Sequence, residues 1–125
     1  MPDDAGEVII QLLPDSSGRW QVVPLSVGED VVLEMLPNPG SSESSISRRT
    51  RDRLLNTPHL VYLGQNGYIL RDLAVEGQIL SDLEVRVHAG PALLGVDGIL
   101  GYSFFRKFVA VLWEPRSNRL RLFDA

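Results

Sequence analysis

The stretch Gly95-Val96-Asp97-Gly98-Ile99-Leu100-Gly101-Tyr102-Ser103-Phe104-Phe105-Arg106-Lys107-Phe108 says more about the fold of this chain than any other part of it. In this stretch an apolar pair, Ile99-Leu100, is closed by Gly101, and a short aromatic segment with helical spacing follows. Two strand-like segments, 108–113 and 119–123, come next and are separated by five turn-forming residues. The order therefore predicts a tight turn, a short helix and a terminal hairpin.

Outside this stretch the apolar residues mostly recur with period two, which is typical of strands. Strands are expected at 7–13, 20–27, 31–36, 58–63, 68–75 and 78–87, and short helices at 48–55 and 102–107. Ser47 can cap the first helix, whose apolar side would be Leu54 and Leu55. A long polar loop is expected at 37–47, and Asn66-Gly67 is a strong hairpin signal. These elements predict an all-β fold, a small closed barrel with one or two short helices.

Two strands near the C-terminus carry further expectations. In 78–87, alternation places Ile79, Leu83, Val85 and Val87 on one face, which is typical of a half-buried strand. The last strand, 119–123, would be an exposed edge, and an exposed edge needs a partner to cover it.

Composition bounds the function only broadly. The chain has 125 residues, 44% of them apolar, which fits a single domain over 1–125 with a flexible N-terminus at 1–6. A net charge of −4 argues against nucleic acid as a partner, and the lack of cysteine excludes disulfides and thiolate metal sites. No apolar run approaches the roughly 20 residues of a membrane helix, and the start is acidic and polar, so we expect a soluble, cytoplasmic protein.

The stretch 97–108, together with 73–85 and 118–122, resembles the C-terminal part of retroviral-type aspartic proteases, the retropepsin-like domains. The resemblance implies their barrel and a homodimer whose terminal strands contribute to the interface. It also implies an Asp-Thr/Ser-Gly triplet on a loop after an apolar strand upstream. In this chain the matching place reads Asn38-Pro39-Gly40.

This difference bears directly on the reaction that the family performs. Retropepsin-like proteases use two aspartates, one from each subunit, which share a proton to activate water. Asn38 cannot ionise, Pro39 lacks the hydroxyl of the family's Thr or Ser, and the hairpin at Asn66-Gly67 is short for a flap. The resemblance therefore predicts a pseudoprotease that serves as a dimerisation or peptide-binding module.

The resemblance also implies which residues would form the groove and which would support it. The groove candidates are Ser41, Ser42, Gln65, Asn66, Gly67, Ile99 and Leu100, and the expected structural residues are Asp97, Gly98 and Gly101. Asp97, Glu34 and Glu43 are carboxylates that could replace the missing acid, but each is better explained by a local or solvated role. An active aspartic endopeptidase with an unrecognised acid stays open as the alternative.

The remaining polar residues suggest no further chemistry. The arginines of 48–53 are interpreted as a solvated helix face, with binding of an acidic partner or nucleic acid as the alternative. His59 and His88 match neither a nucleophile elbow with the nearby serines nor a zinc motif. We therefore expect no metal and no cofactor, since phosphate-loop and dinucleotide-binding motifs are also absent from the sequence.

Overall fold

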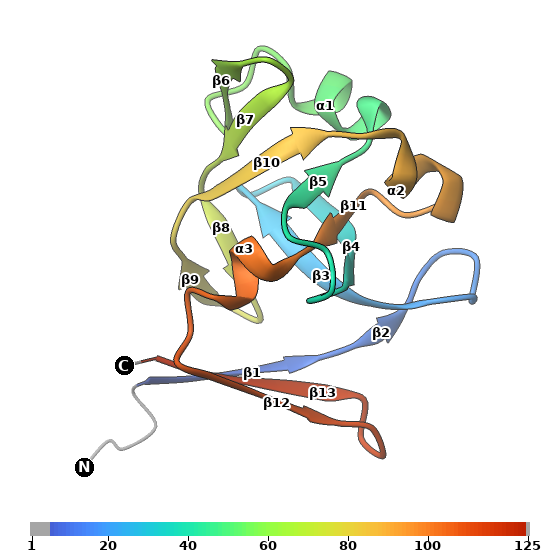
Figure 1. The fold of residues 1–125 in the computed structure, drawn as a ribbon, viewed down its shortest axis with the longest axis vertical. Coiled ribbons are helices and arrows are strands. Elements are labelled where there is room, and N and C mark those ends of the chain that lie inside the picture. Colours follow the sequence, from blue (N-terminus) through green and yellow to red (C-terminus); the bar gives the residue numbers. More distant parts are fainter. Residues whose placement is uncertain (1–5, 125) are drawn as a thin grey trace.

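The structure is a computed structural model that describes residues 6–124 (Figure 1). Its helices are α1 (Arg48–Leu54), α2 (Ala89–Leu94) and α3 (Tyr102–Phe105). Its strands are β1 (Glu7–Gln11), β2 (Leu13–Pro14), β3 (Gln21–Val27), β4 (Val31–Pro37), β5 (Ser44–Ile46), β6 (Leu60–Gly64), β7 (Gly67–Leu70), β8 (Leu73–Val75), β9 (Gln78–Leu80), β10 (Leu83–Val87), β11 (Gly98–Leu100), β12 (Ala110–Glu114) and β13 (Arg119–Phe123). The expectation of an all-β architecture is confirmed.

The strands form two sheets. Ten strands make a curled sheet with the order β6-β7-β10-β5-β11-β4-β3-β8-β9, and β2 pairs with β3 beside this path. The other sheet has the order β1-β13-β12 and joins the two ends of the chain (Figure 1). Within the large sheet β10 pairs with β5 and β11 pairs with β4 in parallel, so segments far apart in sequence lie side by side.

The core follows from the period-two pattern, because alternate side chains of each strand point inward. Leu33 and Met35 of β4 are fully buried, and the same core cluster includes Ile10 of β1 and Leu122 of β13. The two sheets therefore share one core. Burying each such side chain contributes about 1.5–3 kcal/mol to folding.

Helix α1 begins as expected, because Ser47 Oγ accepts a hydrogen bond from the Thr50 amide at 3.1 Å. Its apolar side differs from the prediction. Leu54 is fully buried, but Leu55 is 44% exposed because the helix ends before it and the backbone turns extended there. Thr50, a polar residue, takes the second inward position and bonds to Ser47 through its hydroxyl.

The loop expected at 37–47 and the expected number of helices both differ from the structure. The expected loop at 37–47 contains β5, whose Ser44 and Ile46 are buried. The serine-rich sequence does not predict this strand, because the burial of Ser44 depends on a hydrogen bond between its hydroxyl and that of Ser103. The chain also has α2, so the described residues form three helices and not one or two.

The two long strands expected after the hairpin are each broken. Asp72 adopts a positive φ of 61° and separates β7 from β8, and a break between Leu80 and Leu83 separates β9 from β10. The break shifts the alternation by one residue, so in β9 Leu80 packs against the core and Ile79 is 88% exposed, whereas Leu83 and Val85 are buried as predicted. The preceding hairpin turns at Gln65 and Asn66, both with positive φ, one residue earlier than an Asn-Gly turn.

The edge of the small sheet is also not where the sequence placed it. Strand β13 lies in the middle, between β1 and β12, so among the described strands β1 and β12 are the two edges of this sheet. The expected flexible segment 1–6 lies outside the described residues except for Gly6, whose carbonyl accepts a hydrogen bond from the Asp124 amide. None of the helices found within 6–124 is long and apolar enough to cross a membrane.

Candidate functional site

The loop that follows β4 carries Asn38, Pro39 and Gly40, which the sequence resemblance matches to the catalytic triplet. The Asn38 amide donates to the Leu100 carbonyl at 2.8 Å, which fixes the loop to the end of β11. The Asn38 side chain is exposed, and its Oδ1 accepts a hydrogen bond from the Gly40 amide at 3.1 Å. Its Nδ2 lies 3.5 Å from Ser41 Oγ, at the limit of hydrogen bonding. The asparagine side chain thus closes a local turn.

The other end of this loop is held by Ser44 and by the glycine after β11. Ser44 Oγ accepts a hydrogen bond from the Gly101 amide at 2.9 Å and lies 2.8 Å from Ser103 Oγ. A Cβ on Gly101 would meet the carbonyls of Ser41, at 2.7 Å, and of Glu43. Only glycine lets the two backbones approach this closely, which explains why the apolar pair of β11 is closed by glycine.

Gly98 and Asp97 fix the start of β11. A Cβ on Gly98 would meet the Met35 side chain at 2.7 Å and the Ser45 carbonyl. Asp97 Oδ2 accepts a hydrogen bond from the Glu34 amide at 2.8 Å, and its carbonyl accepts one from the Ser47 amide at 2.9 Å. The Asp97 carboxylate therefore bonds to the backbone of β4, and the residue links β4 to the start of α1.

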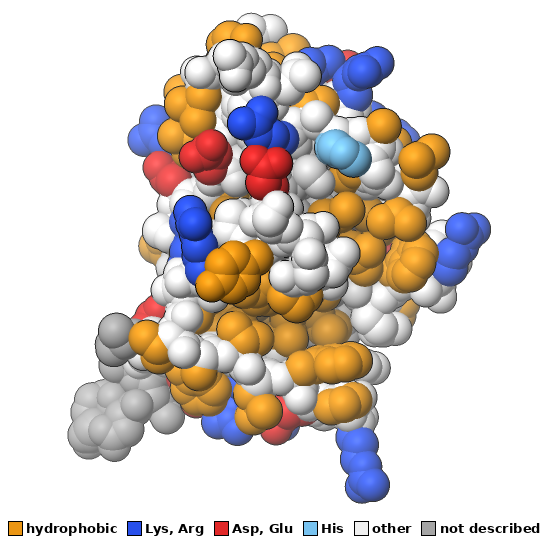
Figure 2. Space-filling view, in the orientation of Figure 1, with side chains coloured by type: hydrophobic (Ala, Val, Ile, Leu, Met, Phe, Trp, Pro, Cys, Tyr) orange, Lys and Arg blue, Asp and Glu red, His pale blue; other side chains and the backbone are white. Residues whose placement is uncertain are grey.

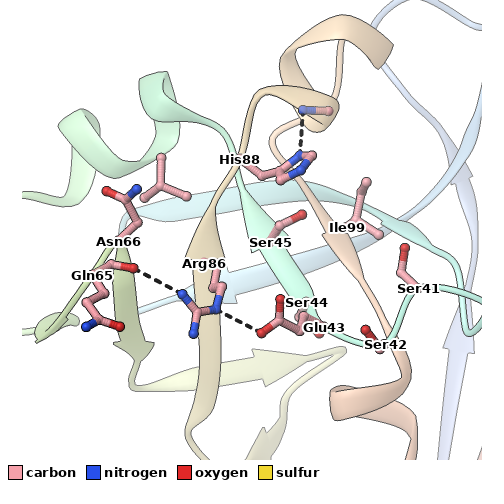
Figure 3. A pocket seen from close by; sticks show the side chains of 12 residues that line it. Ser41, Ser42, Glu43, Ser44, Ser45, Gln65, Asn66, Arg86, His88 and Ile99 are labelled. Atoms are coloured by element: carbon pink, nitrogen blue, oxygen red, sulfur yellow. Dashed lines mark hydrogen bonds and ion pairs between the residues drawn. The ribbon is translucent and has the colours of Figure 1, made fainter.

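Beside this loop lies a hollow of about 320 Å³ that we call the polar groove (Figure 3). It is lined by Ser41, Ser42, Glu43, Ser44, Ser45, Gln65, Asn66, Arg86, Val87, His88, Gly90 and Ile99. Five groove candidates from the sequence lie together here, from the loop after β4, the β6–β7 turn and β11. The other two, Gly67 and Leu100, are buried and do not line the groove.

The charges in the polar groove are mutually paired. Arg86 Nε lies 2.8 Å from Glu43 Oε2, and Arg86 Nη1 donates to the Gln65 carbonyl at 3.0 Å (Figure 3). Glu43 is the one carboxylate among the described residues that line the groove. Glu34, the other acid near the loop, accepts hydrogen bonds from Ser16 outside the groove. The groove thus presents hydroxyls, amides and one internal ion pair.

Sequence reasoning missed Arg86 and His88, because both reach the groove through a long-range parallel pairing. In the register of β10 and β5, Arg86 lies opposite Ser45. His88 follows β10 directly and caps α2, with its Nδ1 accepting a hydrogen bond from the Gly90 amide at 2.9 Å. Pro91 is the feature of the sequence that could have indicated helix α2, and with it the capping role of His88, since proline is favoured in the first turn of a helix.

A second hollow, of about 900 Å³, lies on the other side of the loop, and we call it the apolar hollow. Figure 2 shows apolar side chains gathered where the three-stranded sheet faces the rest of the molecule. The lining of the apolar hollow includes Pro39 of the loop, Tyr102 and Phe105 of α3, and Val111 and Trp113 of the edge strand β12. The loop therefore touches both hollows, through Pro39 on one side and Ser41 on the other.

The described residues hold no group of three or more histidine and acidic side chains that could bind a metal ion. His59 lies instead in a pair with Asp72, with 2.7 Å between Nδ1 and Oδ2.

No protein-family model matches this chain, and no curated protein does either. Among solved structures, it is similar to the crystal structure of a retropepsin-like aspartic protease from Rickettsia conorii. The two superpose with a TM-score of 0.62 at 17% sequence identity, over 95% of this chain and 90% of that one. The chain has a retropepsin-like fold.

Proposed function

We propose that this chain is a proteolytically inactive retropepsin-like module that binds an extended peptide segment in the polar groove and assembles as a homodimer. The observation that carries the proposal is the exposed side-chain amide of Asn38, the residue that the sequence resemblance matches to the family's aspartate. Its side-chain oxygen accepts a hydrogen bond from the Gly40 amide, a contact that turns the chain locally.

The chemistry of an amide argues against hydrolysis. An aspartic protease needs one carboxylate to take a proton from water and a second to polarise the carbonyl. An amide can neither take nor give that proton at neutral pH, and each positioned acid or base contributes about 10² to 10⁴-fold to the rate. In a homodimer both copies would carry Asn38, so both contributions would be lost.

The groove nevertheless keeps the features that an extended peptide needs. Its walls come from the loop after β4, from β5, β10 and β11 and from the start of α2, and the turn at Gln65 and Asn66 adds polar groups on one side. Hydroxyls and amides of this kind can bond to a peptide backbone without demanding one side chain. Strands β6 and β7 have five and four residues, so the hairpin has short arms with which to cover a ligand.

The test measures cleavage and binding on the same preparation. Fluorogenic peptides should stay uncleaved between about pH 4 and 7, whereas a peptide array should yield segments that bind and that compete with one another. Cleavage that a statine-type transition-state mimic blocks would contradict the proposal. It would favour the alternative of an active aspartic endopeptidase, for which Glu43 is the acid best placed because it lines the groove. In that case Glu43→Gln should abolish turnover.

The homodimer rests on the apolar hollow and on the free edge of β12. Val111 and Trp113 of this strand are 41% and 59% exposed, and both line the hollow. An apolar edge strand of this kind favours pairing with another chain, and a large exposed apolar surface marks an interaction site. Sedimentation should give twice the chain mass, and Val111→Lys should shift the species to the monomer. A wild-type monomer at all accessible concentrations would contradict the dimer without touching the groove.

A further inference from the structure

We propose that the polar groove continues into a cationic hollow, formed by Arg48, Arg51 and His88, that selects a carboxylate at one end of the bound peptide. The inference rests on the proposed function and adds to it a class of ligand and a direction of binding. The carboxylate could belong to an Asp or Glu side chain or to the C-terminus of the peptide.

The first step is the continuity of the two hollows. The cationic hollow has a volume of about 570 Å³ and is lined by Arg48, Arg51, Asn66, Val87, His88, Ala89 and Ala92. Three of these residues, Asn66, Val87 and His88, also line the polar groove. A peptide lying in the polar groove can therefore extend past His88 toward α1 without leaving the surface.

The second step is the charge. The described residues that line the cationic hollow include two arginines and no carboxylate. Arg48 is exposed and forms no ion pair with any residue within 6–124. Arg51 lies 2.7 Å from Asp52 through its Nε, so part of its charge is compensated, although a guanidinium carries further N–H donors. Hydrogen bonds with Asp52 and with the Tyr68 side chain raise the pKa of Arg51, and a guanidinium is charged in any case.

The third step is the asymmetry between the two ends. At the other end the cation Arg86 is already neutralised by Glu43 at 2.8 Å and satisfied by the Gln65 carbonyl. At the α1 end Arg51 is also paired, with Asp52, but Arg48 forms no ion pair with any residue within 6–124. Uncompensated positive charge therefore lies at Arg48, and a bound carboxylate is expected beside it. Arginine suits this ligand because its planar fork can hold a carboxylate with two parallel hydrogen bonds.

His88 adds an N–H donor, and its capping hydrogen bond to α2 sets which ring nitrogen carries the hydrogen. Because Nδ1 accepts a hydrogen bond from the Gly90 amide, the neutral ring carries its hydrogen on Nε2. That N–H is available at the junction of the two hollows. An acidic peptide fits better than nucleic acid, since the chain carries a net charge of −4 and only two of the α1 arginines line the hollow.

The experiment begins with an array of octapeptides in two forms, with free and with amidated C-termini, probed with the full chain. We expect the binders to share Asp, Glu or a free C-terminus at one end. Replacing that Glu by Gln, or amidating that terminus, should weaken binding about tenfold, which tells the two sources of the carboxylate apart. Binders with no acidic preference would overturn the inference and leave the proposed function standing. No binding at all would overturn both.

Helix α1 supplies a matched control. Arg48→Ala/Arg51→Ala and Arg49→Ala/Arg53→Ala remove the same charge, but only the first pair lines the hollow. The first variant should bind the acidic peptide about tenfold more weakly and the Gln peptide unchanged, whereas the second should bind both within about twofold of wild type.

Arg48→Ala alone covers the case in which the loss of the Arg51–Asp52 pair disturbs folding, and it should give about a threefold loss for the acidic peptide. Equal losses in both double variants would show a general charge effect and overturn the inference. Binding of a single-stranded oligonucleotide that weakens equally in both double variants would do the same, because it would assign the whole arginine face to nucleic acid.

Discussion

Gly101→Ala is the substitution for which the structure gives the most direct expectation. The new methyl group would lie 2.7 Å from the Ser41 carbonyl and also against the carbonyl of Glu43, whereas ordinary contacts are 3.4–4 Å. Both neighbours are backbone atoms of the site loop, so neither can rotate away as a side chain could. The loop must shift, and the hydrogen bond from the Gly101 amide to Ser44 must shift with it.

Overpacking of this kind costs about 1–3 kcal/mol. With an unfolding entropy of about 2.1 cal/mol/K for each of the 125 residues, this corresponds to a decrease in Tm of roughly 4–11 °C. Scanning calorimetry measures it, and Gly6→Ala is the matched control. Its Cβ would meet only ordinary contacts of 3.5 Å or more, and its Tm should stay within about 2 °C of wild type. An unchanged Tm in Gly101→Ala would refute the view that this close approach holds the loop.

Three further predictions concern the site and its support. Asn38→Asp/Pro39→Thr should not give robust cleavage of fluorogenic peptides, because the hairpin over the groove has short arms. Ser44→Ala should lower the free energy of unfolding, measured in urea, by about 1–3 kcal/mol. The Gly101 amide donates a hydrogen bond to the Ser44 hydroxyl and would lose this acceptor. Asp15→Asn should flatten the acid side of the stability profile. The amide of Trp20 lowers the pKa of Asp15 below 3.8, so this residue's contribution is present above that pH and is lost as the pH falls through the lowered value.

The parts of the fold that the sequence predicted well are those set by local pattern. The terminal hairpin of β12 and β13, the Ser47 cap and the strand β4 each follow from alternation or from a capping residue that acts over a few positions. Strand β5 was missed because its polar residue is satisfied from a distance, by Ser103 of α3. The edge of the small sheet was misplaced because nothing local shows that β1 covers β13.

The same distinction explains the site. Ser41, Ser42 and Ile99 were found by their position beside a recognisable motif, and all three line the polar groove. Arg86 and His88 were not found, since only the parallel pairing of β10 with β5 brings them there. A site built on neighbouring parallel strands is thus harder to predict than one on a hairpin. A hairpin turn fixes which residues of its two strands lie opposite each other, whereas the long connection between parallel strands does not.

The contacts of Asn38 also indicate whether its place in the fold depends on its charge. Its backbone amide bonds to Leu100, and its side-chain oxygen accepts from the Gly40 amide. An aspartate oxygen would accept the same hydrogen bond, so the residue's structural contacts do not depend on its charge. The loop is held instead by Gly101 and Ser44, which take no part in proton transfer. Asn38→Asp should therefore change the free energy of unfolding by no more than about 0.5 kcal/mol at neutral pH, as an exposed substitution does. A much larger loss in urea unfolding would mean that the neutral amide is needed for folding, and that stability constrains the residue at this position.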